Sequence, residues 1–223
     1  MTRLLLASAS PARRATLTAA GLDPLVAVSG VDEDAVLAAA RARFGEVEPA
    51  DAVLVLAQAK AEDVARRLDE LEVAGWDDDE DVLVLGCDSM LELDGEVLGK
   101  PSDADDALAR WRAMRGRSGV LHTGHWLIDE RDPADGGTRA TLGATASTVV
   151  HFADLSDDEV AAYVATREPL AVAGAFTVDG RGGPFVERIE GDHHNVVGVS
   201  LPLLRHLLAE IDVTVPSLWR PAR

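Results

Sequence analysis

The stretch VLGCDSMLELDGEVLGKP, residues 84–101, decides the fold of this sequence. An apolar strand over residues 82–85 is expected to end at a glycine and to lead directly to Asp88. An Asp-Gly pair at 94–95 then stands between two short alternating runs, which is the strongest short-range signal for a β-hairpin. We expect the hairpin to bring the carboxylate of Asp88 close to the ammonium of Lys100 at an end of a sheet, a usual place for an α/β active site. The simpler alternative is an aspartate that caps a turn and a lysine on the surface.

The composition sets the broad class of the protein. A chain of 223 residues with 47% hydrophobic content can bury one large core, and its longest apolar runs are too short for a transmembrane helix. The apolar run near the amino terminus ends at Ser8, so we expect a buried strand there and not a signal peptide. A formal charge of −18 disfavours nucleic acid polymers and anionic membranes as partners. The single cysteine, Cys87, excludes an intrachain disulfide and fits a reducing cytoplasm.

The amino-terminal segment predicts an anion-binding loop. Residues 3–7 form a strand, and a helix to about residue 20 begins at Ser10, a suitable N-cap followed by proline. Free amides and the helix dipole at such an N-terminus favour an anion. Arg13 and Arg14 lie in the first helical turn, where the dipole disfavours cations, so either they bind an anion or they extend into solvent.

Two further helices carry candidate charged residues. A helix over about 33–43 opens with acids, and Glu33 among them either binds a metal or substrate or only complements the helix dipole. A longer helix over about 50–71 has apolar residues at helical spacing. Lys60 interrupts its apolar middle, so its ammonium either snorkels to water or meets an anion.

The remaining segments predict an α/β fold with a mixed, partly antiparallel sheet flanked by helices. We expect a short strand at 25–28, a helix from 102 to about 114, strands at 120–128, 139–152 and 185–189, a helix from 154 to about 167 and a last helix at 201–210. Residues 1–212 form a single domain and residues 213–223 a loose C-terminal tail. A glycine-dense loop over 173–184 allows a ligand to approach the backbone closely.

Other possible sites are disfavoured. The acidic run 77–81 lacks the interleaved spacing of a calcium loop. His193 and His194 point in opposite directions if the chain is extended, which disfavours a shared metal. Neither histidine is placed to activate Cys87 as a nucleophile.

Several segments together resemble the Maf family of nucleoside triphosphate pyrophosphatases. They follow the family's order and cover most of the chain: LLLASASPARR (4–14), VDED (31–34), AQAKAEDVA (57–65), VLGCDS (84–89), LDGEVLGKP (93–101), HTG (122–124), EPLAVAGAFTVDGRGGPFVERIEGDHHNVVG (168–198) and LPLL (201–204).

The resemblance implies hydrolysis of a nucleoside triphosphate to the monophosphate and pyrophosphate, with a divalent metal such as Mg²⁺, or Mn²⁺ or Co²⁺. It implies two lobes around a cleft, as in the inosine triphosphate pyrophosphatase-like fold. It makes Asp88 the general base and a metal ligand together with Glu33. The phosphate-contacting positions fall on Ser8, Ser10, Arg13, Lys60 and Lys100, with Arg14 at the rim. Such a site would be a local cationic pocket in an acidic protein.

The base-specificity positions fit neither known pattern of the family. Members acting on dTTP and UTP carry arginine, threonine and glutamine there, and the 7-methyl-GTP type carries tryptophan, glutamine and glutamate. This chain has Ala12, Ser89 and Asp179. A carboxylate only accepts hydrogen bonds, so Asp179 favours guanine or cytosine over thymine or uracil, and Ala12 leaves room for a purine or a modified guanine.

One alternative function uses the same residues. A nucleotide-binding regulatory protein with little turnover needs the same cationic pocket, with Asp88 only as a metal ligand. We expect a nucleoside triphosphate as the partner, and the sequence leaves monomer and homodimer both open.

Overall fold

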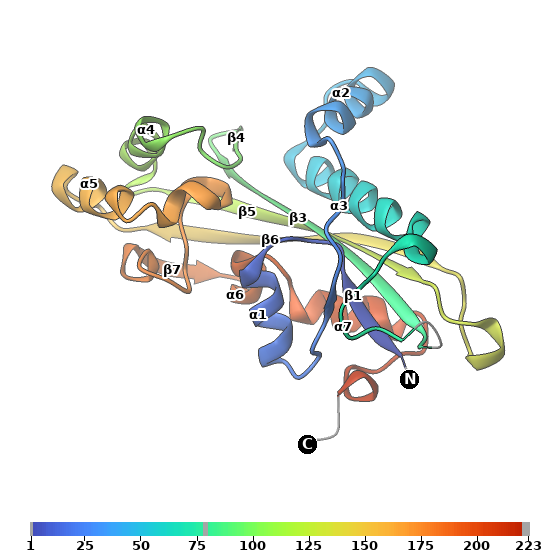
Figure 1. Cartoon of the computed structure of the whole chain (residues 1–223). Helices are drawn as coiled ribbons and strands as arrows, with labels where there is room; N and C mark the ends of the chain where they lie inside the picture. The colour runs from blue at the N-terminus through green and yellow to red at the C-terminus, as the bar shows by residue number, and fades with distance from the viewer. Residues whose placement is uncertain (1, 78–79, 220–223) are drawn as a thin grey trace.

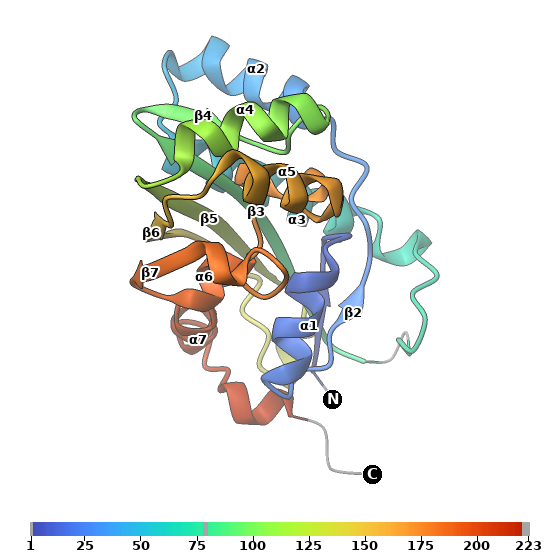
Figure 2. The same cartoon turned by 90° about the vertical axis from the view of Figure 1, so that its left-hand side faces the viewer.

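The computed structural model describes residues 2–77 and 80–219 and holds a seven-stranded mixed sheet between helices (Figures 1 and 2). The strands are β1 (Arg3–Leu6), β2 (Leu25–Val26), β3 (Val82–Leu93), β4 (Glu96–Leu98), β5 (Ser118–Asp129), β6 (Thr141–Phe152) and β7 (Val186–Glu190). The helices are α1 (Pro11–Ala19), α2 (Glu33–Phe44), α3 (Pro49–Arg66), α4 (Ala104–Met114), α5 (Asp157–Ala165), α6 (His193–Val197) and α7 (Leu201–Ala209). The predicted α/β class with a mixed sheet is confirmed.

The sheet is interrupted along one edge of β3. The strand order is β2-β1-β3-β5-β6-β7, with β1 parallel to β2 and β3, and the later strands antiparallel to their neighbours. On the edge opposite β5, β1 pairs with residues 82–85 of β3, and β4 pairs with residues 91–93. Residues 86–90, including Asp88, therefore lie in a gap between β1 and β4.

The predicted end of β3 at Gly86 is wrong, because β3 continues to Leu93 and places Asp88 in mid-strand. The reason is a close helix contact. A Cβ atom at Gly86 would lie 2.1 Å from the carbonyl oxygen of Ala57 in α3, so glycine allows α3 to pack onto the sheet. The predicted hairpin itself is confirmed, with a turn at 94–95 between β3 and β4.

Two groups of core side chains lie at the two ends of β3. At its first half, Leu83 and Leu85 pack with α1 and α7 on one face, and Val82 and Val84 pack below α3 on the other. At its second half, Leu91 and its neighbours pack with α4 and α5. Figure 1 shows α2 and α3 on one side of the long strands and α1 and α7 on the other. Asp88 lies between the two groups.

The chain after α7 differs from the predicted loose tail. Val213 and Leu218 are buried in the same core as α7, so the segment packs on the domain as far as Trp219, and residues 220–223 lie outside the described part. The short helix α6 is an element that the sequence analysis did not predict. Within the described residues, no helix combines the length and the apolarity that crossing a membrane requires.

Candidate active site

Asp88 meets two charged side chains from other elements. Along β3, side chains alternate between faces, and Asp88 shares the α3 face with Gly86. The Lys60 ammonium of α3 donates to Asp88 Oδ1 at 2.5 Å and also lies 2.6 Å from Glu33 Oε1. Asp32 caps the start of α2, accepting from the Ala35 amide at 3.0 Å, and so fixes Glu33 as the first residue of the helix. Of the two outcomes expected for Lys60, snorkelling to water or meeting an anion, the structure shows the second, and the anion is a pair of carboxylates.

The electrostatic state of Asp88 follows from this setting. Asp88 is only 7% exposed, and burial is the largest influence on it, raising the pKa of its carboxyl. The positive charges of Lys60 and Arg13 act against burial, and the net result is a raised pKa. A buried carboxylate with a raised pKa is suited to accept a proton near neutral pH.

Arg13 is buried and most of its donors are used within the protein. Its guanidinium donates to the carbonyl oxygens of Gly198 (2.7 Å) and Cys87 (2.9 Å) and to the hydroxyls of Ser8 (3.0 Å) and Ser89 (2.9 Å). A guanidinium has five N–H groups, so four of them are engaged. Arg13 therefore joins α1, β3 and the end of α6, and it brings a positive charge beside Asp88.

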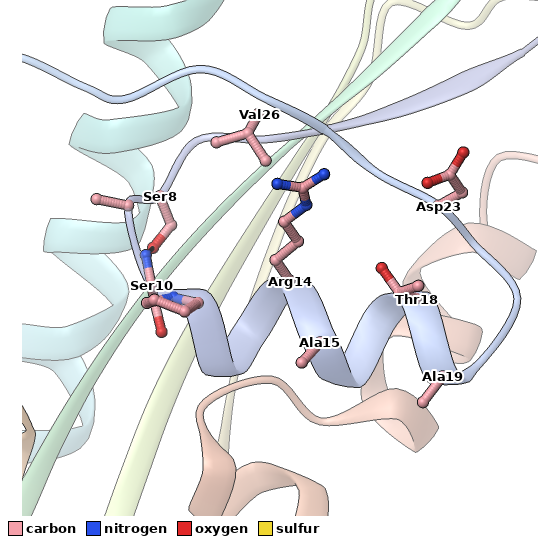
Figure 3. A pocket seen from close by; sticks show the side chains of 10 residues that line it. Ser8, Ser10, Arg14, Ala15, Thr18, Ala19, Asp23 and Val26 are labelled. Atoms are coloured by element: carbon pink, nitrogen blue, oxygen red, sulfur yellow. Dashed lines mark hydrogen bonds between the residues drawn. The ribbon is translucent and has the colours of Figure 1, made fainter.

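The loop between β1 and α1 opens onto a pocket. Ser10 caps α1 as predicted, accepting from the Arg13 amide at 3.4 Å, and Ser8 Oγ accepts from the Ser10 amide at 3.2 Å. The pocket beside this loop has a volume of about 670 Å³. It is lined by Ser8, Ala9, Ser10, Pro11, Arg14, Ala15, Thr18, Ala19, Asp23 and Val26. Figure 3 shows the exposed Arg14 side chain extending from α1 toward Val26.

Three of the predicted residues lie apart from the Asp88–Lys60 pair. Lys100 is exposed, and its ammonium has no ion pair within residues 2–77 and 80–219, so the expected Asp88–Lys100 contact is not formed. Ala12 is half-buried in α1, and its carbonyl accepts from the Thr16 hydroxyl at 3.0 Å. Asp179 is exposed in the glycine-dense loop. Ser89, in contrast, contacts both Arg13 and the Thr123 hydroxyl at 2.9 Å.

The glycine-dense loop is ordered by Glu168, which the sequence analysis did not single out. One oxygen of Glu168 accepts from the Thr177 hydroxyl, from the Tyr163 hydroxyl (3.4 Å) and from the Gly182 amide (3.3 Å). A Cβ atom at Gly180 would lie 2.6 Å from that same oxygen, so the loop needs glycine there to close around Glu168. The carboxylate thereby fixes the segment that carries Asp179.

The residues around Asp88 fit a hard divalent cation. Carboxylate oxygens of Glu33 and Asp88 converge from α2 and β3 on one cationic atom, Lys60 Nζ. Oxygen ligands of this kind suit Mg²⁺ or Mn²⁺.

Three further stretches were considered as possible sites: the His193–His194 pair, Cys87 and the acidic run 77–81. His193 and His194 begin α6 with ring centroids 3.8 Å apart, so the expected opposite orientation is wrong, and with Asp192 they form a group of possible ligand atoms within 4.8 Å. Cys87 is fully buried, and burial raises the pKa of its thiol to about 11, which leaves it protonated. The acidic run 77–81 lies partly outside the described residues.

Comparisons with known proteins agree with one another. A family model described as Maf-like protein matches residues 3–211. A nucleoside triphosphate pyrophosphatase of Salinispora tropica is 58% identical over 217 residues, which cover 97% of this chain and 87% of the relative. Proteins of the same name from Streptomyces avermitilis and Streptomyces coelicolor are 53% and 54% identical over 219 and 220 residues. These alignments cover 98% and 99% of this chain, and 95% and 96% of the two relatives.

Proposed function

The chain belongs to the family of Maf-like proteins, and from this membership we propose that it is a hydrolase that cleaves a nucleoside triphosphate to the monophosphate and pyrophosphate. The observation that carries the proposal is the convergence of Asp88, Lys60 and Glu33 in the gap between β1 and β4. The attacking water requires a base, which Asp88 supplies. The phosphate chain requires positive charge, which Lys60 supplies.

Each residue has a distinct part in this proposal. Asp88 accepts the proton of the water that attacks the α-phosphorus, in line with the leaving pyrophosphate. Lys60 neutralises phosphate oxygens and holds Asp88 in place. Ser8 and Ser10 offer hydroxyls to the phosphates from the loop before α1. Arg13 contributes a positive charge near Asp88.

A divalent metal ion, Mg²⁺ with Mn²⁺ or Co²⁺ as alternatives, is part of the proposal. Glu33 and Asp88 would hold it, and when bound it supplies Lewis-acid polarisation of the phosphate oxygens. Arg14 and Lys100 are exposed, and we propose that they approach the outer phosphates from the rim.

Pyrophosphate release across canonical and modified triphosphates, with Mg²⁺ present, tests the reaction. We expect Asp88→Asn to lower turnover by about 10²–10⁴-fold while nucleotide binding, measured by calorimetry, persists. Asp105→Asn, at an exposed aspartate in the first turn of α4, is the matched control and should turn over normally. Full turnover by Asp88→Asn would refute its role as the base. Nucleotide binding without any pyrophosphate release by the wild type would favour the regulatory alternative.

We also propose a cellular compartment for the protein. A single buried cysteine and an acidic surface fit a cytoplasmic enzyme that acts on a free nucleotide. The expectations of no nucleic acid polymer and no membrane partner, and the choice between monomer and homodimer, stay predictions.

A further inference from the structure

A second group of reactive side chains lies on the sheet face that carries Asp88. Glu92 of β3, His122 of β5 and Ser147 of β6 stand on three adjacent strands. His122 Nδ1 lies 2.8 Å from Ser147 Oγ, and His122 Nε2 lies 3.0 Å from Glu92 Oε2. Glu92 is four residues beyond Asp88, which places it about 13 Å further along β3. The three side chains are therefore separate from the Asp88–Lys60 pair.

The hydrogen bonds fix which histidine nitrogen carries the proton. A carboxylate can only accept, so the Nε2 atom facing Glu92 must carry a hydrogen. In the neutral imidazole the Nδ1 atom then presents its lone pair to Ser147, and the serine hydroxyl donates to it. A serine that donates to a histidine, which in turn donates to a carboxylate, has the arrangement of an activated nucleophile.

Burial supports the same assignment. His122 is only 8% exposed, whereas the Ser147 side chain is exposed, so the hydroxyl faces solvent and the base lies beneath it. Antiparallel pairing on both sides of β5 holds the three residues in register, since His122 pairs directly with Ser147 and Met90 pairs directly with His122. The array is therefore held by a rigid part of the sheet.

From this geometry we propose that Ser147 is a nucleophile for acyl transfer, with His122 as its base and Glu92 as a positioning residue. Its substrates are small, uncharged activated esters. Three half-buried apolar residues on the same face, Met90, Val120 and Val149, offer contacts to an acyl group. The carboxylate of Glu92, beside His122, disfavours an anionic substrate at this position.

The reaction balances without a cofactor. The Ser147 oxygen attacks the ester carbonyl carbon while its proton passes to His122 Nδ1. The bond to the leaving oxygen then breaks, and that oxygen keeps the electron pair and takes the proton from His122. The products are an acyl-Ser147 ester and a free alcohol, and water hydrolyses the acyl ester by the same proton transfers.

The test treats the full chain with p-nitrophenyl acetate and with a fluorophosphonate. Nitrophenolate release gives the rate, and peptide mass spectrometry locates the adduct. We expect an adduct on Ser147 that forms about 10² times faster, or more, than on the exposed serine of the control position, Ser118. Ser147→Ala should abolish the adduct, and Ser118→Ala should leave it unchanged.

Two further variants distinguish a role of Glu92 and His122 in activating Ser147 from a purely structural role. Glu92→Gln and His122→Gln should each lower the labelling rate at Ser147 at least about tenfold. Glu92 is partly exposed, so Glu92→Gln should keep the wild-type melting temperature and the wild-type rate of pyrophosphate release. If His122→Gln does not fold, the labelling rate of Glu92→Gln alone tests the proposal. Absence of an adduct on Ser147, or an unchanged rate in Glu92→Gln, would overturn the proposal. Because pyrophosphate release does not depend on Ser147, either result leaves the proposed function untouched.

Discussion

Lys60 Nζ lies 2.5 Å from Asp88 Oδ1, and both side chains are only about one-tenth exposed. A buried carboxylate beside an ammonium is held in its charged form more strongly than burial alone would allow. The same ammonium also contacts the half-exposed Glu33. The protonation of Asp88 thus depends on Lys60.

Lys60→Met should impair catalysis and shift its pH dependence. Because the charge of Lys60 lowers the pKa of Asp88, its removal raises that pKa further, and the acid limb of kcat/KM should move to higher pH. We expect a loss of at least about tenfold near neutral pH, measured by pyrophosphate release from pH 5 to 9. Lys100→Met removes an exposed lysine and should leave the acid limb in place. If the acid limb of Lys60→Met stays at the wild-type pH, Asp88 is not the group whose titration controls the rate.

Arg13→Lys should destabilise the fold. A lysine carries its donors on one nitrogen and cannot reach the four acceptors that the guanidinium now serves, including Gly198 in a segment 185 residues away. We expect the free energy of unfolding to fall by about 2–4 kcal/mol, measured by urea denaturation. Arg14→Lys changes an exposed neighbour and should have a negligible effect. Equal stability of the two variants would mean that the Arg13 contacts contribute little.

His125 should make the protein less stable in weak acid. Burial lowers the pKa of His125 to about 4 from the usual 6.5, and the neutral ring accepts from the Ser200 amide at 2.8 Å. The unfolded chain therefore binds more protons between these pH values. The stabilisation is present above pH 6.5 and is lost as the pH falls toward 4, by up to about 3 kcal/mol.

Chemical denaturation over this pH range measures the effect. His125→Gln removes the titrating group and should flatten that part of the curve, whatever its absolute stability. His206→Gln, at an exposed histidine of α7, should keep the wild-type slope. A wild-type curve that is flat from pH 6.5 to 4 would contradict the prediction.

Local signals in the sequence predicted the parts of the site that local chemistry determines. The Ser10 cap and the hairpin after β3 follow from residues close in sequence. The apolar face of α3 left two outcomes for Lys60, snorkelling to water or meeting an anion, and the structure shows the second. Each of these features is decided by hydrogen bonding or polarity within a single element or turn.

The remaining parts depend on contacts between distant segments. Gly86 looked like the end of a strand because its role, the approach of α3, involves a helix 29 residues earlier at Ala57. Arg13 was expected to contact phosphate, but two carbonyls of distant segments and two serine hydroxyls take four of its five donors. The Glu168 contacts that order the glycine-dense loop likewise join residues whose proximity no spacing rule reveals.

The identity of the base should depend on Asp179. Its exposed carboxylate, held on the loop that Glu168 orders, can only accept hydrogen bonds. Guanine presents adjacent N–H donors, whereas thymine and uracil present carbonyl oxygens on either side of a single donor, and these would repel the carboxylate. We expect kcat/KM for a guanine or 7-methylguanine triphosphate to exceed that for dTTP or UTP by about tenfold or more. Asp179→Asn, which can also donate, should reduce this ratio, and Asp105→Asn should preserve it. A wild-type preference for dTTP or UTP would show that Asp179 does not select the base, because a charge facing two carbonyls cannot favour them.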